Sequence, residues 1–131
     1  MRELMDALQF GCAVMGGVMG AMLGGWDGFL YALVLFVVLD YGSGVLLAIS
    51  EKKLSSAVGF KGIAKKVAIF LLVAMANVVD AKILQHGAVI RTAVIFFYLS
   101  NEGISILENI GALGLPIPGK LREVLEQLKE E

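Results

Sequence analysis

The chain has 131 residues, of which 58% are hydrophobic and 18% are charged, and its formal net charge is −1. This balance is far more apolar than that of ordinary soluble domains, so a soluble globular fold is a poor interpretation. The near-neutral charge disfavours a nucleic-acid partner, and a single cysteine with a single histidine offers no ligand cluster or nucleophile and base for an enzyme.

Four apolar stretches divide the chain, at about residues 7–23, 28–49, 67–84 and 88–107. A helix that crosses a bilayer needs about 20 predominantly apolar residues. The second stretch meets this length with Asp40 as its only charge, whereas the first is shorter and rich in glycine. We therefore predict an all-α integral membrane protein, a single membrane domain over residues 1–131, whose four transmembrane helices form two hairpins. Three spans are the alternative.

Glycines line one face of the first stretch. At about 100° per residue, this face carries Gly16, Gly17, Gly20 and Gly24, and methionines lie opposite. Small residues let helix backbones approach closely, which is a main source of helix association in lipid. We expect this face to pack against a helix, and both the second span and a second protomer are open as its partner.

Asp40 lies deep in the second predicted span, where a charge needs a partner or water. Folding the first hairpin about Trp26 would place Asp40 level with Cys12, and neither helix offers a base there. Asp40 is then expected to be protonated, paired with another span or exposed to water. Its simplest structural interpretation is a neutral side chain bonded to Ser43 or to a neighbouring carbonyl.

A basic segment over residues 50–66 separates the second and third spans. It carries five lysines against one acid: Lys52, Lys53, Lys61, Lys65 and Lys66. Short loops rich in lysine stay on the cytoplasmic side, so we predict that this loop and both termini are cytoplasmic. Apolar residues interleave with the lysines, which is typical of an interfacial segment that contacts anionic lipid.

The third and fourth spans carry ionisable residues that a hairpin would bring together. Folding these spans back on each other places Asp80 and Arg91 at matching depth on neighbouring helices, while Lys82 reaches outward, and the three predict a structural charge cluster. By the same reasoning Glu102 lies at the inner boundary, within reach of Lys65 or Lys66.

Polar side chains also gather on single faces of these two helices. Asn77 lies three residues before Asp80 and shares its face. Spacings of three, four and seven place a second group on the fourth helix: Asn101, Glu102, Ser105, Glu108 and Asn109. In one copy such a stripe would be buried against partners, whereas in a ring of copies it could turn toward water and line a pore. The sequence leaves both arrangements open.

The C-terminal segment, residues 119–131, follows glycines and prolines that stop helix propagation. Its apolar residues then recur at helical spacing: Leu121, Val124, Leu125 and Leu128. We predict a short amphipathic helix that lies on the membrane, packs on neighbouring helices or stays exposed to solvent.

Four motifs resemble those of one protein family. They are Asp40-Tyr-Gly-Ser-Gly44, the segment from Lys53-Leu-Ser-Ser56 to Lys65-Lys66, the block Asn101-Glu-Gly-Ile-Ser-Ile-Leu-Glu108-Asn109, and Gly114-Leu-Pro-Ile-Pro118. In this order, over about residues 28–128, they are similar to the toxin-secretion and phage-lysis holin family, of the phage holin family 4 type.

The resemblance implies a phage-encoded protein of the bacterial inner membrane that forms homo-oligomers and opens lesions at a programmed time. An endolysin or a toxin, which need not contact the holin directly, would then leave the cell, and the host would lyse. The family supplies no catalytic residues, and the sequence suggests no cofactor and no metal. A small oligomeric ion channel, or a depolarising protein that releases no macromolecules, is the alternative.

Overall fold

The computed structural model describes residues 1–130, without the side chains of residues 129 and 130. Its elements are α1 (Arg2–Met22), α2 (Gly28–Ser50), α3 (Ser56–Val78), a π-helical turn η1 (Val79–Leu84) that continues α3, α4 (Val89–Ala112) and α5 (Gly119–Glu130). Among the described residues, four helices are long and apolar enough to cross a membrane, and η1 extends α3 to a span of 29 residues. The prediction of an all-α chain with four helices of membrane length is confirmed.

Two side chains fix where α2 and α3 begin. Asp27 precedes α2, and its carboxylate accepts the backbone N–H of Leu30 at 2.8 Å. Ser55 caps α3 in the same way, across 3.2 Å. Such N-cap bonds satisfy donors that the start of a helix leaves free. The connection between the two helices is therefore confined to residues 51–55, and the expected loop over residues 50–66 is too long.

Most of the predicted basic loop is thus helical. Lys61, Lys65 and Lys66 belong to the first half of α3, while Lys52 and Lys53 remain in the short connection. The charges suggested a loop because they interrupt the hydropathy of the span. A helix can carry a charge such as Lys61 near its end, where long side chains reach the interface. Lys66 lies deeper in α3 and is paired with carboxylates of the other helices.

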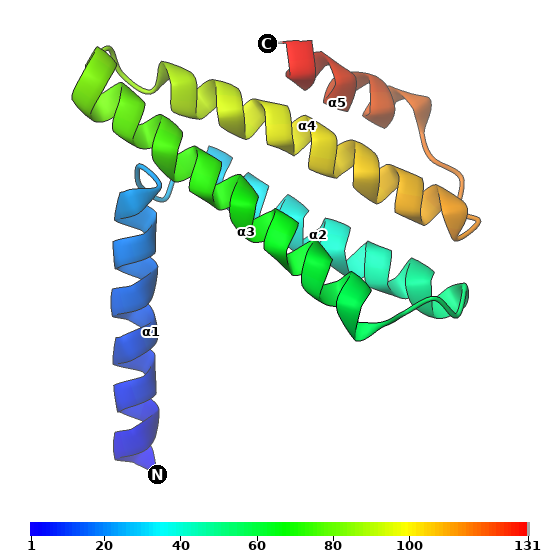
Figure 1. Cartoon of the computed structure of the whole chain (residues 1–131), viewed down its shortest axis with the longest axis horizontal. Helices are drawn as coiled ribbons and strands as arrows, with labels where there is room; N and C mark the ends of the chain where they lie inside the picture. Colours follow the sequence, from blue (N-terminus) through cyan, green and yellow to red (C-terminus); the bar gives the residue numbers. More distant parts are fainter. Residues whose placement is uncertain (131) are drawn as a thin grey trace.

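Helix α4 is the centre of the fold, because it packs against α2, α3 and α5 (Figure 1). The core between α2, α3 and α4 consists of buried aliphatic side chains: Leu30, Leu33, Val37, Ile69, Val73, Ile95 and Leu99. An edge-to-face contact between Phe29 and Phe96, with ring centroids 5.1 Å apart, adds to the α2–α4 interface. These helices form a compact three-helix bundle, and α3 and α4 form the predicted second hairpin.

The turn between α3 and α4 is held by Asp80 in η1. Its carboxylate accepts the backbone N–H of Ile90 at 2.9 Å and that of Arg91 at 2.7 Å. These donors lie in the first turn of α4, so Asp80 caps α4 from the preceding helix. The chain reverses through Gln85 in the left-handed conformation and through Gly87, also at positive φ.

Helix α1 departs from the predicted first hairpin. Figure 1 shows α1 splayed away from the bundle after the turn that leads to α2, and Gly20 is its one buried residue. Apart from the neighbouring residues and backbone of α1 itself, no described heavy atom lies within 4 Å of where a Cβ would sit at Gly16 or Gly17. The expectation that α1 packs along α2, with Asp40 level with Cys12, is therefore wrong.

Two of the glycines that were predicted to pack against a helix are instead covered by single side chains, Trp26 and Arg91. The Trp26 indole donates a hydrogen bond to the Gly16 carbonyl at 2.9 Å and covers Gly20, where a Cβ would lie 2.3 Å from its nitrogen. Gly24 has a φ of +97°, and a Cβ there would lie 2.5 Å from the Arg91 guanidinium. Gly20 and Gly24 thus make room for side chains at the turn between α1 and α2, which explains why α1 does not pack along α2.

Helix α5 folds back along α4 instead of lying apart from the bundle (Figure 1). Leu125 is buried against α4 and α2, and the Ser100 hydroxyl donates a hydrogen bond to the Leu125 carbonyl. Of the three placements considered for the tail, the structure has the helix packed on its neighbours.

Candidate functional site

Three charged side chains meet near the middle of the bundle, one from each of α2, α3 and α4. The Lys66 ammonium is bonded to a carboxylate oxygen of Asp40, and it lies 2.6 Å from Oε2 of Glu102. Asp40 and Glu102 are 6% and 5% exposed, and the Lys66 side chain is 20% exposed. We call Asp40, Lys66 and Glu102 the charge triad.

Residues of α2 and α4 make the remaining hydrogen bonds to Asp40. Asn109 donates to the Asp40 carboxylate at 3.2 Å and to the Ser43 hydroxyl at 3.0 Å, while Ser43 donates to the Asp40 carbonyl at 3.1 Å. Among the described residues, no buried side-chain nitrogen or oxygen lacks a hydrogen-bond partner. Of the states considered for Asp40, the structure therefore shows pairing with another span, and Ser43 bonds the backbone carbonyl of Asp40 instead of its side chain.

The charge balance of the triad is uneven. Two carboxylates share one ammonium, so the fully ionised triad carries one excess negative charge at a depth where charges are expensive. A buried ion pair is stable only when its partners and hydrogen bonds are all in place, and removing one partner is strongly destabilising. The triad can hold three helices together and would make their separation unfavourable unless water reached the site.

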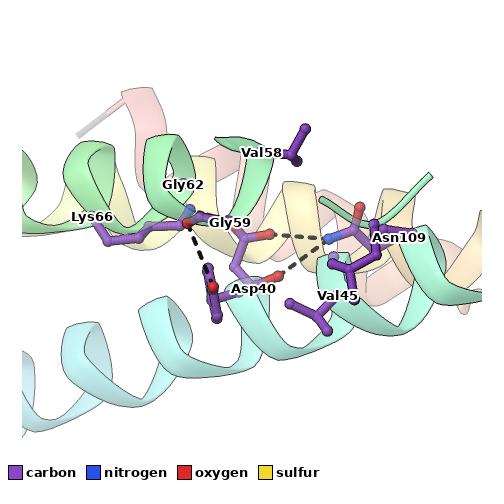
Figure 2. A pocket seen from close by; sticks show the side chains of 11 residues that line it. Asp40, Val45, Val58, Gly59, Gly62, Lys66 and Asn109 are labelled. Carbon is purple, nitrogen blue, oxygen red and sulfur yellow. Dashed lines mark hydrogen bonds and ion pairs between the residues drawn. The ribbon is translucent and has the colours of Figure 1, made fainter. Parts of the chain in front are cut away.

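An open cavity of about 220 Å³ adjoins the triad between the ends of α2 and α3 that face residues 51–55. Figure 2 shows Asp40 between Lys66 and Asn109, and Val45 and Val58 are among the apolar residues that line the cavity. A space of this size next to charged groups can hold several water molecules. Asp40 thus borders an open space as well as the packed core.

Tyr41 forms a wall of this cavity, and two glycines of α3 make room for its ring. Its hydroxyl donates to the Gly59 carbonyl at 3.5 Å. A Cβ at Gly59 would lie 3.3 Å from that hydroxyl, and a Cβ at Gly62 would lie 3.4 Å from the ring. The glycines of α3, which the sequence analysis did not single out, therefore shape the cavity beside the triad.

A second polar cluster lies at the opposite end of the bundle, around Arg91. This side chain is 3% exposed, and its guanidinium donates to the carbonyls of Leu23 and Gly25 at 2.5 and 3.0 Å and to the Asp27 carboxylate at 2.8 Å. Arg91 thus ties α4 to the turn between α1 and α2. The Arg91 guanidinium also lowers the pKa of Asp27 below its ordinary value of 3.8.

The predicted cluster of Asp80 and Arg91 is wrong in its contacts. The two residues are neighbours, but Asp80 binds the backbone N–H of Arg91, and the Arg91 side chain turns to Asp27. Asn77 also serves this end, because it donates to the Met22 carbonyl at 3.3 Å. Sequence reasoning missed Asp27, although an aspartate immediately before an apolar helix is a common N-cap signal.

The predicted polar stripe of α4 divides between two faces. Glu102 and Asn109 point to Asp40, whereas Asn101 is half-buried elsewhere and Glu108 is exposed. Lys66 was expected both at the lipid interface and as a possible partner of Glu102, and the structure places it in the triad. The other four lysines of the basic segment are exposed: Lys52, Lys53, Lys61 and Lys65.

Comparison with known proteins adds to these observations. The model of the bacteriophage holin family matches residues 17–130. An uncharacterized Clostridium perfringens protein is 39% identical over 132 residues, which cover 100% of this chain and 99% of the relative. An uncharacterized Listeria monocytogenes protein is 46% identical over 118 residues, covering 90% of this chain and 84% of the relative.

A relative with a stated role is a probable holin of Bacillus phage phi105. It is 32% identical over 103 residues, which cover 79% of this chain and 76% of the relative. No solved structure matches the chain. Among the described residues, no three histidine, cysteine, aspartate or glutamate side chains are grouped to hold a metal ion. With four helices of membrane length and a family match over most of its sequence, the chain is a membrane protein that belongs to the bacteriophage holin family.

Proposed function

We propose that this protein acts as a holin: it oligomerises in the bacterial inner membrane and opens lesions at a programmed time, so that an endolysin or a toxin leaves the cytoplasm and the host lyses. The observation that carries this proposal is the charge triad. Three ionisable groups satisfy one another within a single copy, near the middle of three helices of membrane length. Membership of the holin family and the phi105 relative support it.

The triad supplies a latent polar surface. A charged group at the centre of a membrane helix costs about 2.5–3.5 kcal/mol on insertion scales, and pairing within the bundle offsets this cost. If α2 separated from α3 and α4, Asp40 would lose the Lys66 ammonium and would need water. Packed copies would therefore be stable as closed bundles, and a water-lined assembly would be stable once many copies supply a common interior.

Helix α1 supplies the proposed contact between copies. It is almost fully exposed, and its Gly16 and Gly17 face has open space. Exposed apolar surface does not drive association in lipid, but close approach of backbones at small residues does. Because α1 does not pack along α2, this face is free to receive a helix from a second copy.

The exposed lysines near residues 51–55 support the proposed orientation. Lys52, Lys53 and Lys61 cluster where α2 ends and α3 begins. By the positive-inside rule this end faces the cytoplasm, together with the N-terminus, and α5 starts from the same end before it runs back along α4. The lysines there would contact anionic lipid, each contributing about 1 kcal/mol near the surface.

The cavity beside the triad favours one alternative, a small oligomeric channel that depolarises the membrane and releases no macromolecules. Water reaching Asp40 through that 220 Å³ space would create a narrow polar path without a large lesion. The size of the solute that escapes distinguishes this channel from a large-hole holin.

The test is inducible expression in bacteria, with viability, membrane potential and escape of a folded cytoplasmic reporter enzyme followed together. One culture receives an uncoupler early, and a culture with the empty vector is the control. A delayed and abrupt collapse with reporter release, advanced by the uncoupler, is the expected result. Depolarisation without reporter release would assign the channel instead, and continued growth would refute both functions.

A further inference from the structure

Helix α5 presents an unusual combination of place and polarity. It lies against the middle of α4, on a side of α4 different from that of α3 (Figure 1). Its exposed residues include the charged or polar Lys120, Glu123, Glu126 and Gln127, beside two apolar residues, Leu121 and Val124, which are about half exposed. A helix with this face is not what lipid would be expected to cover.

The contact that holds α5 is closely fitted. A Cβ at Gly103 would lie 2.8 Å from a methyl carbon of Leu125 and 3.1 Å from the Phe36 ring. Ser100 is fully buried and donates its hydroxyl to the Leu125 carbonyl. We call Phe36, Ser100 and Gly103 the Leu125 notch. Because a Cβ at position 103 would require Leu125 to shift, the notch is fitted to the docked position of α5.

The notch lies near the middle of the membrane. Gly103 precedes the end of α4 at Ala112 by nine residues, which is about 14 Å at the helical rise of 1.5 Å per residue. Half of a hydrocarbon core about 30 Å thick is about 15 Å. With α4 spanning the bilayer, docked α5 therefore holds Glu126, the neighbour of Leu125, close to the bilayer centre.

Charged side chains at that depth face the interior of a bundle or a water-filled cavity rather than lipid. The outer face of α5 meets no other helix of this chain in the part that the structure describes, since its extensive contact is with α4. By contrast, α3 exposes apolar residues beyond the level where Lys66 meets Glu102. Leu71 is 66% exposed and Met75 is 60% exposed, and they lie about 8 and 14 Å farther from residues 51–55. The two sides of the bundle thus suit different surroundings.

We propose that the face of α2 and α4 that carries the Leu125 notch faces water in the assembled protein, with α5 docked on it, and that the outer side of α3 faces lipid. This inference rests on the proposed function, because several copies are needed to enclose the water. It assigns α5 to the interior of the assembly and gives the lesion a lining made of the charged face of α5.

The first test measures thiol accessibility in native membranes that are permeable to the reagent from both sides. Cys12 is replaced by serine, and single cysteines are introduced as Glu126→Cys and, as the control on the outer side of α3, Leu71→Cys. Because hydrocarbon suppresses the reactive thiolate, a charged thiol reagent should label the α5 site on the order of tenfold faster or more than the α3 site. Equal and slow labelling of both sites would overturn the proposal.

The second test asks whether α5 is docked while it is accessible. In the double variant Gly103→Cys and Leu125→Cys, shortening Leu125 removes the methyl groups that exclude a Cβ at position 103, so a disulfide can form. Efficient oxidation to an intramolecular disulfide, together with labelling at position 126, is the expected result. Labelling without this disulfide would mean that α5 leaves α4 in the membrane, which also overturns the proposal.

Reporter release by the same variants separates the inference from the proposed function. In one outcome, labelling and disulfide formation are as expected, but cells that express the Cys12→Ser protein release no reporter. This result would refute the proposed lesion and leave the water-facing side of the bundle supported. Release with lipid-like protection of position 126 would refute the water-facing side while the holin function stood.

Discussion

Replacing Lys66 by methionine removes the ammonium that holds Asp40 and Glu102 together. The methionine keeps the length of the side chain, so the principal change is the loss of one charge shared between two carboxylates. Both carboxylates are nine-tenths buried or more. Removing one member of a buried charge pair costs about 3–5 kcal/mol, because the remaining charge loses its compensation.

That cost can be expressed as a shift in equilibrium. At 1.36 kcal/mol for each factor of ten, Lys66→Met should raise the ratio of separated to packed bundles by about 10²- to 10⁴-fold. The matched control is Lys65→Met, one position away and exposed, for which a change of about 0.5 kcal/mol or less is expected. The assay is loss of helical packing during titration of the purified protein with a denaturing detergent.

A triple variant tests the electrostatic origin of the effect. Adding Asp40→Asn and Glu102→Gln to Lys66→Met removes every charge of the triad while retaining similar shapes. Neutral replacement of a whole buried ion network is often close to harmless, so the triple variant should recover most of the lost stability. A triple variant as unstable as Lys66→Met would refute the reasoning, since packing and not charge would then govern this site.

Three further results are expected. Arg91→Ala should release the turn between α1 and α2, and an increase in the mobility of a spin label on α1, with little change for a label on α3, would show it. The contact with Arg91 lowers the pKa of Asp27 below 3.8, so the stabilisation of the turn by this ion pair is complete above that value and is lost as the pH falls through the lowered pKa. The mobility of the spin label on α1 should therefore rise in an acid titration. An Asp27→Asn variant should show no such transition. Gly17→Leu should reduce crosslinking between copies and delay lysis if α1 is the contact, with the bundle intact, whereas Gly20→Leu should also displace Trp26 and change its fluorescence; unchanged crosslinks in Gly17→Leu would remove this face from the proposed assembly.

Hydropathy predicted the number of membrane-length helices because burial in lipid depends on each segment by itself. Folding the third and fourth spans back on each other predicted that Glu102 lies within reach of Lys65 or Lys66, and Lys66 is its partner. Both results follow from length and depth along antiparallel helices. They do not depend on how steeply two helices cross.

The errors concern the crossing and rotation of helices, which are decided by side chains in contact. Equal depth predicted that Asp40 meets Cys12, but Trp26 and Arg91 fill the places on the glycine face where α2 would have packed. Depth also paired Asp80 with the Arg91 side chain, although the backbone donors at the start of α4 are nearer partners. When each helix is predicted by itself, the sequence does not indicate which of several possible partners a side chain will contact.

The bonds that Asp80 makes to the first turn of α4 have a mechanical consequence. They fasten η1 to α4, so α3 and α4 are joined as one rigid unit at this end. The link between α2 and α3 is the short segment 51–55, without a comparable clamp among the described residues. A movement that preserved the Asp80 bonds would hinge α2 away from the other two helices, and Lys66 would then keep Glu102 and give up Asp40.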